Sequence, residues 1–164
     1  MKNILLVTIP HTGTRFFIKM LEQQYFHSRH HIMRDRTEKR PLTLHQFATC
    51  HTEYPKLALE YIEKFNPIVI TCERHVDGIM ESLRKRRGDD AERHYEKALV
   101  GYNEIFYNTI PHVSLSFDAE DRQDRLDKLS KIIEHPLDAG TWDKVGSWDD
   151  KNHGRGRDWP LKQT

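Results

Sequence analysis

Two short apolar runs, each followed by a helical pattern, constrain the fold of this chain more than any other feature. The run Ile68–Cys72 reads Ile-Val-Ile-Thr-Cys, and the N-terminal run Lys2–Thr8 is similarly rich in aliphatic residues. Runs without polar alternation predict strands that are covered on both faces of a parallel sheet. Because such strands alternate with helical patterns along the chain, the sequence predicts an α/β fold in three layers, with helices on both faces of the sheet.

The remaining elements are predicted from apolar periodicity and from breaker residues. Strands are expected at His45–His51 and Val113–Phe117, and helices at Phe17–Tyr25, Pro55–Phe65, Val76–Leu83, Tyr95–Phe106 and Leu126–Ile133. The basic, histidine-rich segment His27–Arg40 has no clear period and is predicted to be an exposed loop. Residues 1–164 are predicted to form a single domain, in which 138–164 are a docked, irregular C-terminal segment.

Charge and cysteine content exclude several classes of protein. Of the 164 residues, 26 are Lys or Arg and 25 are Asp or Glu, so no strong field favours nucleic acid or an anionic membrane. No apolar run approaches the roughly 20 residues of a transmembrane helix. With two cysteines and no targeting signal, we expect a cytoplasmic protein without a disulfide scaffold. The histidines lack the spacing of a metal site, so no metal is predicted.

The loop after the first strand has the composition of an anion-binding turn. It reads Ile-Pro-His-Thr-Gly-Thr-Arg-Phe over residues 9–16. Gly13 gives conformational freedom, and the hydroxyls of Thr12 and Thr14 lie beside free N–H groups at a helix start, where the helix dipole favours negative charge. The loop is not a Walker A sequence, because it lacks the earlier Gly and the Lys that would follow Gly13. A tight turn with threonine caps and no ligand is the alternative.

This loop resembles the 5′-phosphosulfate-binding loop of sulfotransferases that use 3′-phosphoadenosine 5′-phosphosulfate (PAPS). In that family, Pro-Lys/Arg-Ser-Gly-Thr-Thr and an aromatic or apolar residue follow the first strand. The positions that match are Pro10, Gly13, Thr14 and Phe16. Thr12 replaces the family's Ser, His11 stands where the family has Lys or Arg, and Arg15 stands where it often has a second Thr.

Two further segments carry the same resemblance. After the strand Ile68–Cys72, Arg74 and Ser82 have the eight-residue spacing of the family's 3′-phosphate motif, although the usual Pro is replaced by Val76. Near the C-terminus, the stretch 152–159 partly matches the family's Arg-Lys-Gly-x-x-Gly-Asp-Trp stretch. Gly154 stands in register there, and Arg155 is a candidate for the missing positive charge.

The resemblance implies a PAPS-dependent sulfotransferase, an unusually short member of its family, which would release 3′-phosphoadenosine 5′-phosphate (PAP). The acceptor would be a hydroxyl or amine of a small molecule or glycan. The implied cofactor-binding residues are Thr12, Gly13, Thr14, Arg15, Phe16, Arg74, Ser82, Gly154 and Arg155, with Phe16 stacking on the adenine. His51, at the end of a strand, is the predicted general base, and Glu53 is the second choice. His11 would stabilise charge on the bridging oxygen.

Two other functions stay open. A P-loop nucleotide or small-molecule kinase would need Mg²⁺ and usually the Walker lysine. A catalytically silent nucleotide-binding protein is suggested by the short chain and by His11 in place of Lys or Arg. Mg²⁺-dependent turnover of ATP would identify the kinase, and sulfate transfer would exclude the silent protein. The sequence does not predict the oligomeric state.

Overall fold

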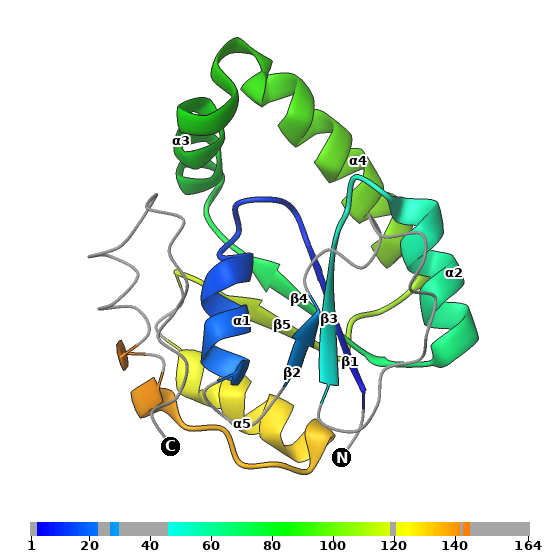
Figure 1. Cartoon of the computed structure of the whole chain (residues 1–164), viewed down its shortest axis with the longest axis vertical. Helices are drawn as coiled ribbons and strands as arrows, with labels where there is room; N and C mark the ends of the chain where they lie inside the picture. The colour runs from blue at the N-terminus through cyan, green and yellow to red at the C-terminus, as the bar shows by residue number, and fades with distance from the viewer. Residues whose placement is uncertain (1–2, 23–26, 30–45, 119–120, 142, 145–164) are drawn as a thin grey trace.

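Five parallel strands form the sheet of this computed structural model, which describes residues 3–22, 27–29, 46–118, 121–141 and 143–144. The strands are β1 (Ile4–Thr8), β2 (His27–Arg29), β3 (Gln46–His51), β4 (Ile68–Glu73) and β5 (Val113–Ser116). Their order in the sheet is β2-β3-β1-β4-β5, and every neighbouring pair is parallel (Figure 1). The predicted α/β fold with a parallel sheet is confirmed.

Helices cover both faces of this sheet. They are α1 (Thr14–Glu22), α2 (Pro55–Phe65), α3 (Val76–Arg87), α4 (Ala91–Asn108) and α5 (Arg122–Ile133), with the short helix η1 (Gly88–Asp90) between α3 and α4. On β1, Ile4 and Leu6 pack with α1 and α5, whereas Leu5 and Val7 pack with α2 and α4. Successive side chains of a strand point to opposite faces, so one continuous apolar run serves two cores.

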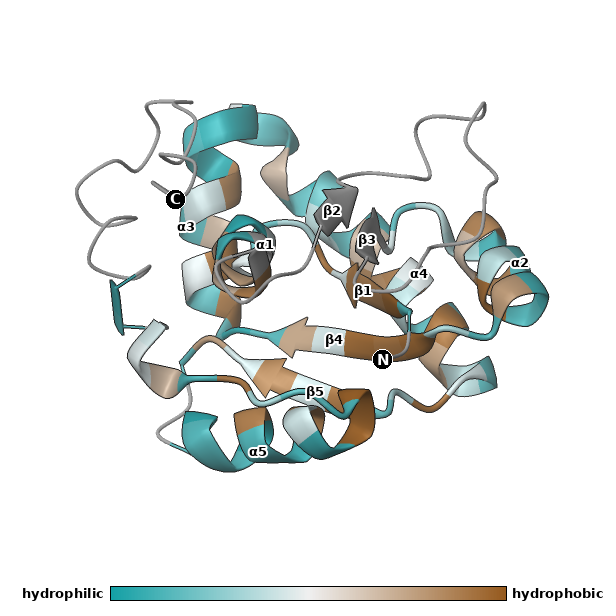
Figure 2. Cartoon of the chain, turned by 60° about the horizontal axis from the view of Figure 1, so that its bottom comes forward, coloured by the Kyte–Doolittle hydropathy of each residue, from teal (hydrophilic) through white to brown (hydrophobic). Residues whose placement is uncertain are grey.

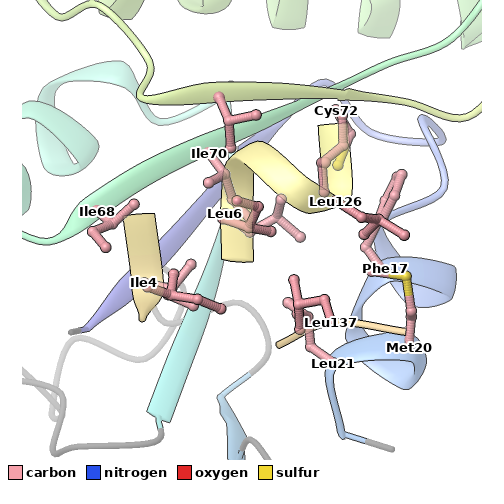
Figure 3. Close-up of a cluster of buried hydrophobic side chains, with 14 of the residues drawn as sticks. Ile4, Leu6, Phe17, Met20, Leu21, Ile68, Ile70, Cys72, Leu126 and Leu137 are labelled. Atoms are coloured by element: carbon pink, nitrogen blue, oxygen red, sulfur yellow. The ribbon is translucent and has the colours of Figure 1, made fainter. Parts of the chain in front are cut away.

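The larger core lies between the sheet and the α1–α5 layer. Figure 3 shows side chains from β1 and β4 meeting those of α1 and α5, and Leu137 closes the cluster from beyond α5. Phe17, Met20 and Leu126 are fully buried there. Each such side chain contributes about 1.5–3 kcal/mol by leaving water. The apolar strands therefore lie inside a shell of more polar helix surface (Figure 2).

A glycine lets α4 approach the turn after β3. A Cβ atom at Gly101 would lie 1.7 Å from the backbone oxygen of Thr52, a distance no side chain tolerates. The Thr52 hydroxyl donates a hydrogen bond of 2.6 Å to the Ala98 carbonyl of the same helix. The end of β3 is thereby fixed against α4.

The structure adds detail to two segments that the sequence analysis described as irregular. His27–Arg29, predicted to be loop, is an edge strand that pairs with residues 46–48 of β3. Three residues at a sheet edge carry too little apolar pattern to be recognised from the sequence. The start of the C-terminal segment is anchored to α5 by the ion pair between Arg122 and Asp143 at 2.7 Å. No described helix is long and apolar enough to cross a membrane.

The strand order creates a switch point between β1 and β4. The chain leaves β1 through α1 on one face of the sheet, and it leaves β4 through α3 and α4 toward the other face (Figure 1). Thr8 at the end of β1 pairs with Cys72 of β4 on one side and with His51 of β3 on the other. Crevices beyond the carboxyl ends of strands at such points are the usual ligand sites of open α/β sheets.

Candidate anion-binding site

The loop between β1 and α1 has the backbone of an anion nest. His11 has a φ of 68° and Gly13 a φ of 88°, both in the left-handed region. Successive residues of alternating hand turn their N–H groups toward a common point, and the start of α1 follows directly. The Gly13 carbonyl accepts the Phe17 amide at 3.0 Å, so Gly13 joins the loop to the helix. A non-glycine residue at positive φ is uncommon, and His11 is held in this conformation by the contacts described next.

α3 lies against this loop and brings the two predicted phosphate motifs together. The His11 Nδ1 atom is 2.7 Å from the Ser82 hydroxyl oxygen, across 71 positions of sequence. The Arg74 Nη1 atom donates to the His11 carbonyl oxygen at 3.2 Å. Arg74, Ser82 and the loop, predicted separately from sequence, therefore lie together in the folded chain.

The predicted threonine ligands have structural roles. The Thr12 hydroxyl donates to the Ile9 carbonyl at 2.8 Å and closes the turn, and only 1% of Thr12 is exposed. The Thr14 hydroxyl shares a 2.7 Å hydrogen bond with that of Thr8, at the end of β1. Both side chains hold the loop in shape. The Thr12 amide also donates to the Ile9 carbonyl, at 3.4 Å, so an anion would have to be bound by the other backbone N–H groups of the loop.

Arg74 is placed by two residues that the sequence analysis did not single out. A Cβ atom at Gly78 would lie 2.8 Å from the Arg74 Nε atom, so only glycine allows the side chain to lie along α3. The guanidinium carbon is 4.9 Å from the centre of the Phe117 ring, at the end of β5, in a cation–π contact. The Nε atom is buried and has no hydrogen-bond partner among the described residues.

Phe117 also supports the loop itself. A Cβ atom at Gly13 would lie 2.5 Å from its ring, and its ring centre is 5.4 Å from that of Phe16 in an edge-to-face contact. Phe16 is 3% exposed and belongs to the larger core. This placement leaves Phe16 no open face on which an adenine could stack, because the helix turns it inward beside Phe17. Its role is to pack beneath the loop.

Positive charge surrounds the His11 imidazole. Burial, followed by four guanidinium groups, lowers the pKa of His11 from 6.5 to about 4; in decreasing order of effect these groups belong to Arg86, Arg87, Arg74 and Arg15. A cation among cations is disfavoured, so the ring is neutral at pH 7. At the position where the sulfotransferase family has Lys or Arg, this chain therefore has a neutral imidazole, which can form hydrogen bonds and is surrounded by positive charge.

The other predicted site residues are less fully placed. The backbone of His51 ends β3 beside Thr8, but its side chain lies outside the described part of the structure, as do Gly154 and Arg155. Glu53, the second choice as base, is within hydrogen-bond distance of His94 of α4, with 3.2 Å between Oε1 and Nδ1. Within the described ranges, no three acidic, histidine or cysteine residues form a group that could hold a metal ion.

Comparisons with known proteins add little to this geometry. No protein-family model and no curated protein matches the chain. Among solved structures, it is similar to the solution NMR structure of a de novo designed protein with the P-loop NTPase fold. That likeness has 14% identity and a TM-score of 0.35, over 93% of this chain and 98% of the other. A likeness this weak carries no argument about function, and the site rests on its own residues.

Proposed function

We propose that the crevice beyond β1 and β4 binds a nucleotide through its phosphate groups, and that the protein is a group-transfer enzyme. The donor that fits the motifs is PAPS, which makes the protein a PAPS-dependent sulfotransferase acting on a hydroxyl or amine. One observation carries the proposal. The His11–Ser82 contact of 2.7 Å joins the loop that resembles a phosphosulfate site to the helix that resembles a 3′-phosphate site.

The charges of the site suit such a donor. The first turn of α1 contains no acidic residue, so no carboxylate of that turn competes with an external anion for the positive end of the helix dipole. The Arg74 guanidinium lies beside the loop, with its Nη1 atom 3.2 Å from the His11 carbonyl oxygen, so its positive charge is next to the place where a phosphate would bind. A guanidinium group is suited to phosphate because its donors form a planar fork.

In the proposed reaction the acceptor oxygen or nitrogen attacks the sulfur of PAPS. The bond between sulfur and the bridging oxygen breaks, and its electron pair stays on the 5′-phosphate of PAP. The proton of the acceptor passes to a base, for which His51 is the candidate. The backbone nest and the arginines stabilise charge that develops on the leaving phosphate, as positioned donors do in phosphoryl transfer.

His11 has a defined part in this proposal. If the Ser82 hydroxyl donates to Nδ1, the Nε2 atom carries the proton and is the nitrogen that could donate to the ligand. The other tautomer would present a lone pair to an anion and is disfavoured when the ligand is bound. Ser82 thus positions His11, and a neutral imidazole supplies the hydrogen bond that the family obtains from a cation.

The test is calorimetric titration with PAP, with ATP and Mg²⁺, and with AMP. We expect selective binding of PAP, weakened by about tenfold or more in Arg74→Ala and less in Arg74→Lys, which keeps the charge but loses the fork. Arg84→Ala is the matched control, because it removes a charge from the same helix at a residue paired with Glu92 at 2.8 Å. Preference for ATP with Mg²⁺ would favour a kinase instead.

A second variant separates position from charge. Gly78→Ala adds a methyl group where Arg74 Nε lies, while alanine favours a helix over glycine by about 1 kcal/mol. We expect Gly78→Ala to unfold at the same or a higher temperature than the wild type, yet to bind PAP several-fold more weakly. If the silent alternative is correct, PAP will bind but no sulfate transfer will be detected with any acceptor.

A further inference from the structure

The two residues that follow β5 are fixed beside the connection from β4 to α3. The Phe117 amide donates to the Glu73 carbonyl oxygen at 2.8 Å, so the pairing of β5 with β4 extends one residue beyond the strand (Figure 1). A carboxylate oxygen of Asp118 accepts the His75 amide at 2.6 Å, directly before α3 begins. Arg74 lies between Glu73 and His75 in the chain, so both of its neighbours are tied to this segment.

The Phe117 ring contacts both of the parts that resemble phosphate sites. A ring carbon would be 2.5 Å from a Cβ atom at Gly13, in the loop before α1. The ring centre is 4.9 Å from the guanidinium carbon of Arg74. An edge-to-face contact with Phe16, 5.4 Å between ring centres, fixes the ring against the larger core. Because such packing leaves no free volume, a shift of the ring would disturb the loop and Arg74 together.

The contact with Arg74 is more than the filling of space. A large aliphatic side chain could also pack against Gly13 and Phe16, whereas attraction of a guanidinium group needs an aromatic face. Arg74 forms no ion pair with a carboxylate in the described ranges, and its contacts with the ring and with the His11 carbonyl oxygen are made by neutral groups. The side chain is thereby held in place while its charge is not neutralised.

We propose, building on the proposed function, that Phe117 is a positioning residue that fixes Arg74 relative to the loop. It thereby determines the preference of the site for a nucleotide with phosphate groups at both the 3′ and the 5′ positions. The loop resembles the site of the 5′ group, and Arg74 belongs to the motif that resembles the 3′-phosphate site. Groups that are already in place lose little freedom on binding, so PAP gains from Phe117, whereas AMP has no 3′-phosphate to meet Arg74.

The experiment compares PAP with AMP in calorimetric titrations of the full-length protein. Phe117→Leu and Phe117→Met fill much of the space of the ring but offer no aromatic face, whereas Phe117→Tyr keeps that face. Phe17→Leu is the matched control, because it makes the same change at a fully buried position of the same core. Arg74→Ala and Arg74→Ala/Phe117→Leu complete a double-mutant cycle. Thermal unfolding defines a temperature at which every titrated variant is folded.

We expect the ratio of PAP affinity to AMP affinity to fall about fivefold in Phe117→Leu and Phe117→Met, as loss of a cation–π contact allows. Phe117→Tyr should keep the ratio of the wild type. Phe17→Leu should lower the melting temperature and leave the ratio unchanged, and Phe117→Leu should not lower the ratio further once Arg74 is alanine.

Two kinds of failure can be told apart. If the wild type prefers PAP and neither Phe117→Leu nor Phe117→Met changes the ratio, the role of Phe117 is overturned and the proposed function stands. An equal fall of the ratio in Phe17→Leu, or in the Arg74→Ala background, would overturn that role too. Failure of the wild type to bind PAP would overturn the proposed function, and the role of Phe117 with it.

Discussion

The starts of α1 and α3 lie at the same edge of the sheet but are completed in different ways. At α3, Asp77 stands in the first turn, and its amide donates to the His75 Nδ1 atom at 3.4 Å. The amide of His75 donates to a carboxylate oxygen of Asp118 at 2.6 Å. At α1, the first turn has no acidic residue, and the nearby charges are those of arginines.

This difference indicates where an external anion can bind. Two carboxylates of the protein already stand at the backbone start of α3, so its N–H groups are not offered to an anion, whereas the Arg74 side chain is turned away to the loop before α1. The first turn of α1 has no acidic residue, and arginines supply the charge around the loop before it. Of these two helix starts, the chain supplies counter-charge to one and leaves the other for a ligand. The predictions below alter α1 or its surroundings and ask whether the contrast persists.

The largest effect is expected from Gly13→Ala, which breaks the loop of α1. An alanine here would have to adopt a φ of 88° with its Cβ atom 2.5 Å from the Phe117 ring. The ring is held by Phe16 and Arg74, so it cannot move away freely. We expect a loss of about 2–4 kcal/mol in the free energy of unfolding, measured by denaturant titration, together with loss of PAP binding.

Gly88→Ala is the control for this prediction. Gly88 also has positive φ, at 56°, but a Cβ atom there would meet nothing within 4 Å. With a ψ of −127°, Gly88 lies outside the left-handed helical region, so the expected loss is a conformational cost of about 1–3 kcal/mol, with PAP binding retained. Loss of PAP binding in both variants would contradict the role given to Gly13 and Phe117.

A smaller effect is expected from Arg15→Glu, which makes the start of α1 resemble that of α3. A carboxylate in the first turn interacts favourably with the helix dipole, by about 0.5 kcal/mol, so the unliganded protein should be as stable as the wild type or slightly more so. The same carboxylate would repel a bound phosphate. We expect PAP affinity to fall by more than about tenfold, measured by calorimetry. Arg15→Gln, which removes charge without adding its opposite, should lose only a few-fold, and unchanged binding by Arg15→Glu would refute an anion site at α1.

Features of the fold and of the site could be predicted from the sequence when they depend on residues that are close together in the chain. The strands Ile68–Cys72 and Val113–Phe117 and the loop with Gly13 could be identified because apolar runs and turn residues act over a few positions. Arg74 and Ser82 could be paired because their eight-residue spacing after a buried strand resembles the 3′-phosphate motif of the sulfotransferase family.

Contacts between distant segments were not predictable in this way. Phe117 supports both Gly13 and Arg74, and nothing near it in the sequence indicates either contact. From the sequence, Gly78 is only a residue that destabilises a helix. Its role in making room for the Arg74 side chain is evident only from the structure. For Phe16, two roles were compatible with an aromatic residue at a helix start, and its inward direction was decided by packing against Phe117.

The smallest effect, and the most specific to this site, is the pH dependence conferred by His11. Its pKa is about 4 in the folded protein, chiefly through burial and then through the arginines, against an ordinary value of 6.5. The unfolded chain therefore binds more protons between these values, and the contribution of His11 to the free energy of unfolding falls as the pH is lowered from 6.5 toward 4. It is fully present above 6.5.

Anion binding should reverse this trend. The negative charges of PAP offset the arginines, raise the pKa of His11 and couple binding to proton uptake, so affinity gains from His11 as the pH falls. We expect the melting temperature of the unliganded wild type to fall by a few degrees more than that of His11→Asn between pH 7.5 and pH 5, and PAP to shrink that difference. Asparagine tolerates positive φ, and titration of the PAP phosphates is common to both proteins, so the difference isolates the imidazole. Identical pH profiles for the two proteins would mean that the His11 ring does not titrate against the arginine field. The positive charge attributed to the start of α1 would then be unsupported. The two helix starts would differ only in that α3 has carboxylates and α1 has none.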